Sequence, residues 1–95
     1  MIEPILPERF AGDMALWIEY GVAPGGFLQA VLTNDLRDTF ARADYQSVRE
    51  VAGIVSWLYN KAPAGCWGSP ADCAAWYAAR RPARQAYMAA QGEGP

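Results

Sequence analysis

The sequence predicts an all-α protein, built as a compact bundle of four to five short helices. Three observations support this fold class. Apolar residues recur at helical intervals along most of the 95 residues. No segment alternates between apolar and polar residues as a half-buried strand does. Glycine, proline and cap residues divide the chain into pieces of helix length. We therefore expect a single helical domain over 1–95, with an extended lead-in at 1–7 and a frayed tail at 92–95.

Composition and charge exclude several classes of protein. Apolar residues make up 53% of the chain, which is too many for an ordinary disordered tail. A formal net charge of −2 predicts neither a nucleic-acid interface nor a polybasic membrane anchor, and no apolar run approaches the ~20 residues that span a bilayer. The first residues lack the features of a signal peptide, so we expect a cytoplasmic location. Because so small a domain buries only about 60–65% of its unfolded surface, we also expect a homo-oligomer.

The sequence also argues against catalysis. Histidine is absent, which removes Ser-His-Asp and Cys-His chemistry and most zinc sites. The two cysteines, Cys66 and Cys73, fit a reduced cytosolic protein and make half a zinc site at best. The acidic residues show no spacing typical of a metal site or a glycosidase. We therefore expect no enzyme activity, no catalytic residue, no metal and no cofactor.

The first helix is predicted from Glu8 to Tyr20, ending at Gly21 as a natural C′ residue. Its apolar residues fall on one side at i, i+4, i+7 and i+8: Phe10, Met14, Trp17 and Ile18. A loop follows at 22–26.

The next apolar run, residues 27–43, contains an awkward carboxylate. An i, i+4 row continues through Leu28, Leu32, Leu36 and Phe40. An unbroken helix would place Asp35 inside this apolar arc. Either the helix breaks at Asn34 and Asp35 caps a new segment, or Asp35 is a partly buried carboxylate with a specific partner. Asn-Asp is typical of turns and caps, so we favour the break.

Asp44 is predicted to cap a helix from Tyr45 to about Tyr59. Its inner face is expected to comprise Val48, Val51, Ala52, Ile54, Val55, Leu58 and Tyr59. Trp57 falls on the opposite, polar side. It is predicted either to contact another part of the fold or to bind an external ligand or subunit.

A further helix is predicted to start at Ser69, with Pro70 at N1 and Asp72 at N3 in a variant of the capping box. A face of small residues should allow this helix to pack closely: Ala71, Ala74, Ala75 and Ala78. The Arg80-Arg81-Pro82 sequence ends or kinks it, and a short last helix is expected from Pro82 to about Gln91.

Two predicted helix starts follow glycine, in Pro24-Gly25-Gly26-Phe27 and in Trp67-Gly68-Ser69. The free amides of a helix start, together with the helix dipole, suit a phosphate or a carboxylate. The alternative is that the glycines form tight turns where helices pack closely. Several aromatic residues are able to stack on a base, and basic residues are available to neutralise charge. These are Trp57, Trp67, Tyr45 and Tyr59, with Arg42, Arg49 and Lys61.

Two blocks of the sequence resemble a family of small proteins encoded by temperate phages and prophages. The blocks are Gly21-x-x-Pro24-Gly25-Gly26-Phe27-Leu28-x-Ala30-Val31-Leu32-x-Asn34-Asp35-Leu36, followed by Arg42-Ala43-Asp44, and Pro63-x-x-Cys66-Trp67-Gly68-Ser69-Pro70 with Trp76. Together they cover roughly residues 20 to 77. The family is not one with an assigned enzyme activity. The resemblance implies a phage accessory protein, a class in which some members counter host defence by sequestering nucleotide signals and others block a host protein.

Our first hypothesis is a non-enzymatic phage accessory protein that sequesters a small anionic, nucleotide-type signal. Its expected ligand-binding residues are Gly25, Gly26, Phe27, Asp35, Trp67, Gly68 and Ser69. The alternative is an inhibitor or adaptor that binds a host protein. Its contact candidates are Trp57, Trp17, Arg80, Arg81 and Arg84. A small structural or morphogenesis protein is the third interpretation.

Overall fold

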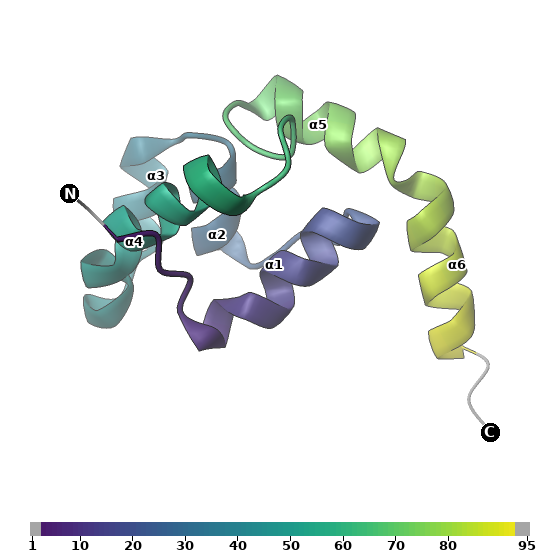
Figure 1. The fold of residues 1–95 in the computed structure, drawn as a ribbon, viewed down its shortest axis with the longest axis horizontal. Coiled ribbons are helices and arrows are strands. Elements are labelled where there is room, and N and C mark those ends of the chain that lie inside the picture. The colour runs from purple at the N-terminus through teal and green to yellow at the C-terminus, as the bar shows by residue number, and fades with distance from the viewer. Residues whose placement is uncertain (1–2, 93–95) are drawn as a thin grey trace.

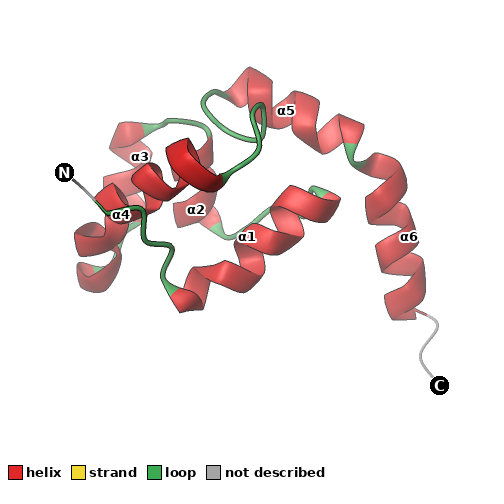
Figure 2. Ribbon diagram, in the orientation of Figure 1, coloured by secondary structure: helices red, strands yellow, loops and turns green. Residues whose placement is uncertain are grey.

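The computed structural model describes residues 3–92, and all the regular elements in this range are α-helices (Figure 1, Figure 2). They are α1 (Glu8–Tyr20), α2 (Gly26–Leu32), α3 (Leu36–Arg42), α4 (Tyr45–Lys61), α5 (Pro70–Ala79) and α6 (Arg81–Gly92). The all-α prediction is confirmed, but these residues form six helices rather than four to five. The first two positions of the predicted lead-in, and residues 93–95 of the predicted tail, lie outside the described range.

The additional helix results from a break between α2 and α3. Asn34 takes a left-handed backbone conformation with φ of 61°, and the Asp35 N–H donates to the Ala30 carbonyl at 2.9 Å. This six-to-one bond closes the end of α2 as a Schellman motif does. The Asp35 carboxylate then accepts a hydrogen bond from the Asp38 N–H at 2.9 Å and caps α3. The cap interpretation of Asp35 is therefore confirmed.

The break also corrects the predicted apolar row. Leu28 and Leu32 are buried, but Leu36 is 69% exposed and Phe40 is 46% exposed. An uninterrupted helix would have kept all four on one side. Because Asn34 and Asp35 reorient the chain, the second half of the row faces outward.

The core is formed by α1, α2 and α4. Its buried members are Met14, Trp17, Leu28, Val31, Leu32, Ile54 and Leu58. For α4 the predicted inner face is correct at Ile54 and Leu58 but wrong at Val48, Ala52 and Tyr59, which are exposed. The predicted caps of the two later helix starts are present. The Asp44 carboxylate accepts from the Ser47 N–H at 2.7 Å, and the Ser69 hydroxyl accepts from the Asp72 N–H at 3.0 Å.

Helices α5 and α6 extend from this core as an arm (Figure 1). None of the α5 residues is buried, so the small-residue face predicted for close packing is exposed instead. The arm is anchored from its inner side. The Trp76 indole N–H donates to the Trp17 carbonyl at 3.0 Å, and the Tyr87 ring stacks on Tyr20 with centroids 4.4 Å apart.

A buried arginine fixes the arm to the end of α1. The Arg84 Nη1 donates to the carbonyls of Tyr20, Gly21 and Tyr77 at 3.3, 3.4 and 2.9 Å. Two of these carbonyls lie at the C-terminal end of α1, where the helix dipole favours a cation. With the arm attached in this way, the molecule measures 44 × 29 × 24 Å. No helix in residues 3–92 combines the length and apolar character needed to cross a membrane.

Candidate functional site

The best candidate for a ligand site is a hollow of about 440 Å³ between the end of α4 and the loop that precedes α5. Its lining is Asn34, Val55, Leu58, Tyr59, Ala62, Ala64, Trp67 and Gly68. The volume falls within the range typical of small-molecule sites. The lining combines apolar residues and an aromatic pair with a single carboxamide residue, a composition also typical of such sites.

The aromatic pair consists of Tyr59 and Trp67. The two ring centroids are 5.0 Å apart and the rings are nearly perpendicular, at 88°. Tyr59 is 78% exposed, whereas Trp67 is half-buried against the core. The pair therefore combines a fixed indole with a tyrosine ring that is largely open to solvent.

Hydrogen bonds on both sides of Trp67 hold it in place. Before it, the Cys66 carbonyl accepts the indole N–H of Trp17 at 2.9 Å. After it, the Gly68 N–H donates to the Leu32 carbonyl at 2.7 Å. Gly68 has a φ of 120°, in a region that side chains other than hydrogen rarely allow. The loop is thus attached to α1 and to α2, and Trp67 lies between the two attachment points.

Asn34, just after the end of α2, is also part of the lining of this hollow. Among the described residues it is the non-glycine residue with a positive φ. Asparagine tolerates this conformation better than most residues, so the Schellman turn places a carboxamide beside the aromatic pair with little strain.

The other predicted glycine turn lies elsewhere. Gly25 and Gly26 begin α2, while Gly68 is bonded to Leu32 at the opposite end of the same helix. Phe27 packs its ring on Phe10, with centroids 5.5 Å apart. Of the seven predicted ligand residues, Trp67 and Gly68 line the hollow. Gly25, Gly26 and Phe27 lie at the other end of α2.

The space beside Gly26 is occupied by an arginine. A Cβ at this position would lie 2.8 Å from Nη1 of Arg42. The Arg42 Nε also donates to the Asp38 carboxylate at 2.8 Å. Gly26, Arg42 and Asp38 all line a separate hollow of about 300 Å³ between α2 and α3, together with Gln29 and Thr33. This supports the packing interpretation of Gly26, because the missing side chain leaves room for the guanidinium.

The polar groups expected to hold a ligand at the other turn are already engaged. Asp35 caps α3 and the Ser69 hydroxyl caps α5, while the Gly68 N–H is bonded to Leu32. A Cβ on Gly68 would lie 3.4 Å from the Asp72 carboxylate, so a negative charge is close to this helix start. These contacts disfavour a phosphate at Gly68-Ser69.

The chain was compared with protein-family models, curated proteins and solved structures. No protein-family model, no curated protein and no solved structure matches the chain. The resemblance to temperate-phage proteins therefore depends on the two sequence blocks alone.

The residues predicted as protein contacts are mostly internal. Trp17 is 4% exposed and belongs to the core, so the structure contradicts its assignment as a contact. Arg84 is 9% exposed and bonded to three carbonyls, which contradicts its assignment as well. The guanidinium of Arg80 stacks on Trp76, 4.0 Å from the ring centroid. Arg81 is exposed and remains accessible to a partner.

Trp57 is half-buried and packs against the core. It lines a third hollow, of about 360 Å³, beside α1 and the lead-in. Its polar-side position on α4 is therefore explained in part by a contact within the fold, one of the two interpretations given by the sequence. Part of the ring remains accessible from the hollow.

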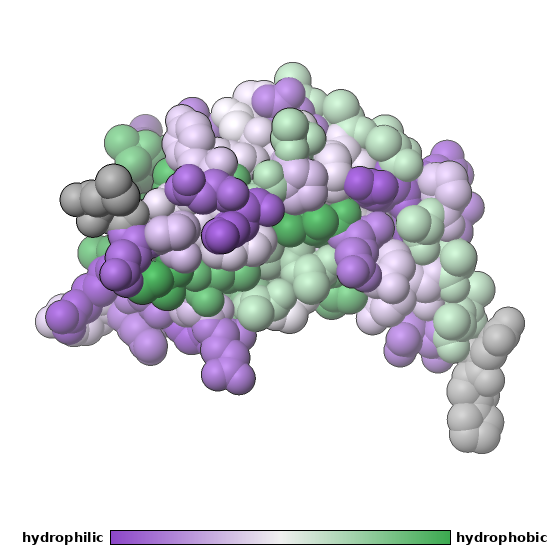
Figure 3. Space-filling view, in the orientation of Figure 1, coloured by the Kyte–Doolittle hydropathy of each residue, from purple (hydrophilic) through white to green (hydrophobic). Residues whose placement is uncertain are grey.

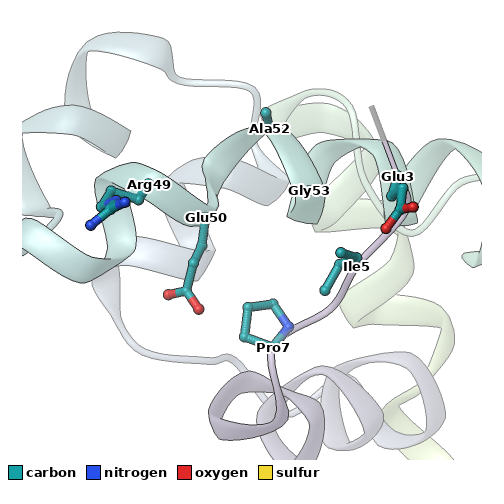
Figure 4. A pocket seen from close by; sticks show the side chains of 7 residues that line it. All are labelled: Glu3, Ile5, Pro7, Arg49, Glu50, Ala52 and Gly53. Carbon is teal, nitrogen blue, oxygen red and sulfur yellow. The ribbon is translucent and has the colours of Figure 1, made fainter. Parts of the chain in front are cut away.

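A fourth hollow, of about 390 Å³, separates the lead-in from α4 (Figure 4). In Figure 4 Pro7 of the lead-in lies beside Glu50, whose carboxylate is paired with Arg9, while Ile5 lies nearer to Gly53 and Arg49 points away from both. A Cβ on Gly53 would approach the Ile5 carbonyl oxygen to 3.1 Å. This glycine therefore allows the lead-in backbone to lie close to the middle of α4.

The two thiols, Cys66 in the loop before α5 and Cys73 in α5, are poor nucleophiles. Burial raises the pKa of Cys66 to about 11, and burial is also the main reason that the pKa of Cys73 is raised. The Cys73 thiol is directed at the Leu32 carbonyl, with 3.4 Å between sulfur and oxygen. Since the thiolate is the reactive form, the raised pKa values of both thiols disfavour a role as nucleophile.

The raised pKa of Cys66 predicts a pH-dependent stability. Because the thiol ionises near pH 9.0 when unfolded and near pH 11 when folded, its contribution is complete below pH 9 and decreases from pH 9 to 11. We expect the free energy of unfolding of the native protein to fall more steeply across this interval than that of Cys66→Ala. Urea titrations at pH 8, 9 and 10 under reducing conditions measure both slopes. Parallel slopes would contradict the assignment, because the two proteins differ only at Cys66.

Sequence reasoning missed two features of the hollow. Tyr59 was recognised as able to stack but was placed on the inner face of α4, although it projects into solvent. Asn34 was treated as a turn residue only. The sequence contained a local signal for each of these two residues. Asn34-Asp35 marks the end of α2, and Asn60 and Pro63 mark the end of α4 next to Tyr59.

Proposed function

We propose that the protein is a non-enzymatic binding protein for a small ligand with a planar aromatic group, the base of a nucleotide-type signal. The observation that carries this proposal is the Tyr59–Trp67 pair in the lining of the 440 Å³ hollow, which also includes Asn34. A base that enters the hollow would stack on the open tyrosine ring and be bounded by the indole. Base–aromatic stacking contributes about 1–3 kcal/mol per base.

Asn34 and Gly68 complete this arrangement. A carboxamide offers one acceptor and two donors, which suits the hydrogen-bonding edge of a base. Gly68 has no side chain to obstruct the ligand on the side of the loop. The hollow is lined by no carboxylate, thiol or imidazole, which favours binding over catalysis.

The lining also bears on the anionic part of the predicted ligand. It contains no lysine or arginine, so the phosphate of a nucleotide would remain at the solvent-exposed rim. We therefore expect the base to supply most of the affinity. In the context of the phage resemblance, such a protein would counter host defence by holding a nucleotide signal away from its receptor.

Calorimetry with alanine variants of two exposed tyrosines tests this function. Tyr59→Ala should weaken binding of a nucleotide by about 10-fold or more, because a stacking surface is lost. Tyr45→Ala is the matched control, since Tyr45 is 82% exposed and lies at the start of α4, away from the hollow. The panel should contain mononucleotides, cyclic dinucleotides and ADP-ribose, together with adenosine and guanosine to separate the base from the phosphate.

Two outcomes would overturn the proposal. One is the absence of any binding heat for the whole panel at millimolar concentration. The other is equal binding by the two tyrosine variants, which would place the ligand outside the hollow. A nucleoside that binds within a few-fold of its nucleotide supports recognition of the base. A strict requirement for phosphate would contradict the assignment to this uncharged hollow and would point to the region of Arg42 and Gly26.

Binding to a host protein is the second candidate, and an exposed apolar pair on α3 favours it. Leu36 and Phe40 lie one turn apart on the same side of the helix and are 69% and 46% exposed. Exposed apolar side chains that lie side by side mark protein-interaction sites. If the nucleotide panel fails, Leu36→Asp with Phe40→Asp is the variant to test against a defined host protein.

A further inference from the structure

We propose that the exposed side of α6 binds a second copy of this chain, in the hollow beside α1 that contains Trp57. The interface pairs Arg81 of one copy with Glu19 of the other and places Met88 in the apolar hollow. This surface shares no residue with the ligand hollow, so it is independent of the proposed function.

The first step is the shape of the hollow. It has a volume of about 360 Å³ and is lined by Leu6, Ala11, Met14, Ala15, Ile18, Glu19 and Trp57. Six of these seven residues are apolar, and Glu19 supplies the one charge. Ala11 and Ala15 are small and exposed on α1, so another helix is able to approach closely at this point. Within the described residues Glu19 forms no ion pair.

The second step is the chemistry of α6. Arg84 and Tyr87 face α1, and the exposed residues Arg81, Gln85 and Met88 share the flank of α6 next to them. Met88 is 54% exposed, and Arg81 is exposed without an ion pair in the described range. Pale green apolar surface runs along α5 and α6 in Figure 3. The arm thus offers one apolar side chain and one cation on the same side.

The third step is that the two surfaces match in spacing. Arg81 and Met88 are seven residues apart, about 10 Å along a helix. Ala11 and Glu19 are eight residues apart, about 12 Å. An antiparallel pairing of α6 with α1 of a second copy therefore brings Met88 to Ala11 when Arg81 reaches Glu19. Two copies related by a twofold axis would form this contact twice.

The fourth step is charge. Residues 70–92 hold three arginines against Asp72, a net charge of +2, whereas residues 3–69 hold five basic and eight acidic residues, a net charge of −3. The arm of one copy is therefore complementary to the body of another. The chain exposes 6131 Å², compared with about 5,400 Å² for a compact monomer of 10.4 kDa. The excess is close to the ~800 Å² that each partner buries in a standard interface.

Sedimentation equilibrium of the purified chain from 1 to 100 µM tests the interface. We expect a mass twice the 10.4 kDa of the chain. Arg81→Glu should raise the dissociation constant at least 10-fold, and adding Glu19→Arg should restore it by exchanging the two charges. Arg37→Glu is the matched control, because it makes the same charge change at an exposed position on α3. Both altered residues are exposed, and circular dichroism verifies that each variant is folded.

Three results would overturn the proposal: a monomeric native protein at 100 µM, an Arg81→Glu variant that associates as strongly as Arg37→Glu, and a double variant that stays as weak as Arg81→Glu. The first would leave the hollow to a partner of another kind. The second would place self-association on a different face. None of these results depends on Tyr59 or on the nucleotide panel, so this proposal and the proposed function fail separately.

Discussion

Replacing Trp17 with alanine is expected to lower the free energy of unfolding by about 4 kcal/mol. The indole is 4% exposed at the centre of the core, and its N–H donates to the Cys66 carbonyl at 2.9 Å. Removing it leaves a large cavity and frees the loop that presents Trp67. A domain of this size has a total stability of roughly 5–14 kcal/mol, so the loss is a large part of the whole. Urea denaturation followed by circular dichroism measures it.

A comparison of two tryptophans isolates the hydrogen bond. Trp17→Phe and Trp76→Phe each remove an indole N–H, but the acceptors differ. The carbonyl freed by Trp76→Phe, on Trp17, still accepts the Gly21 N–H at 2.9 Å. The carbonyl of fully buried Cys66 keeps only the Cys73 thiol, at 3.9 Å. Trp17→Phe should therefore cost about 1–3 kcal/mol more in unfolding free energy. Equal costs would show that this bond does not hold the loop.

Helix boundaries were predictable here because they depend on neighbouring residues. Asp35, Asp44 and Ser69 each accept a hydrogen bond from the backbone N–H three positions later, so the cap is encoded within four residues. The predicted count of helices was too low. The count depends on whether residues 27–43 form one helix, as the apolar row to Phe40 suggests, or two helices, as Asn34-Asp35 suggests. In the structure, the Schellman bond from the Asp35 N–H to the Ala30 carbonyl ends α2 and separates it from α3.

Side-chain exposure was less predictable, because it depends on which helices come together. Tyr59 follows the apolar period of α4, yet its ring is 78% exposed, whereas Leu58 next to it is buried in the core. Arg84 shows the converse. A basic residue on a predicted surface helix is buried because the carbonyls of Tyr20 and Gly21, more than 60 positions earlier in the chain, accept its hydrogen bonds. No local pattern contains that information.

The candidate site was partly predicted for the same reason. Trp67 and Gly68 were expected together because they are adjacent in the sequence. Gly25 and Gly26 were assigned to the same ligand because glycine before a helix suits an anion, but the two turns lie at opposite ends of α2. Residue type identified possible functions of each turn, whereas the distance between the turns required the packed structure.

Gly21→Ala is expected to lower the free energy of unfolding by about 3 kcal/mol. Gly21 has a φ of 67°, which costs a side chain roughly 1 kcal/mol. The added Cβ would also lie 2.8 Å from Nη1 of Arg84 and 2.9 Å from Cβ of Arg80. Arg84 would have to move away from the carbonyls at the end of α1, and the arm would lose its main polar attachment. Thermal and urea unfolding measure the effect.

The same substitution earlier in α1 should have the opposite sign. Gly12 lies inside the helix, is exposed, and a Cβ there would meet nothing within 4 Å. Gly12→Ala should therefore raise the free energy of unfolding by about 0.5–1 kcal/mol, through helix propensity alone. If both variants shift stability in the same direction, the strain and crowding assigned to Gly21 are wrong. Opposite shifts would support the backbone strain and the crowding by Arg84 and Arg80 that are assigned to Gly21.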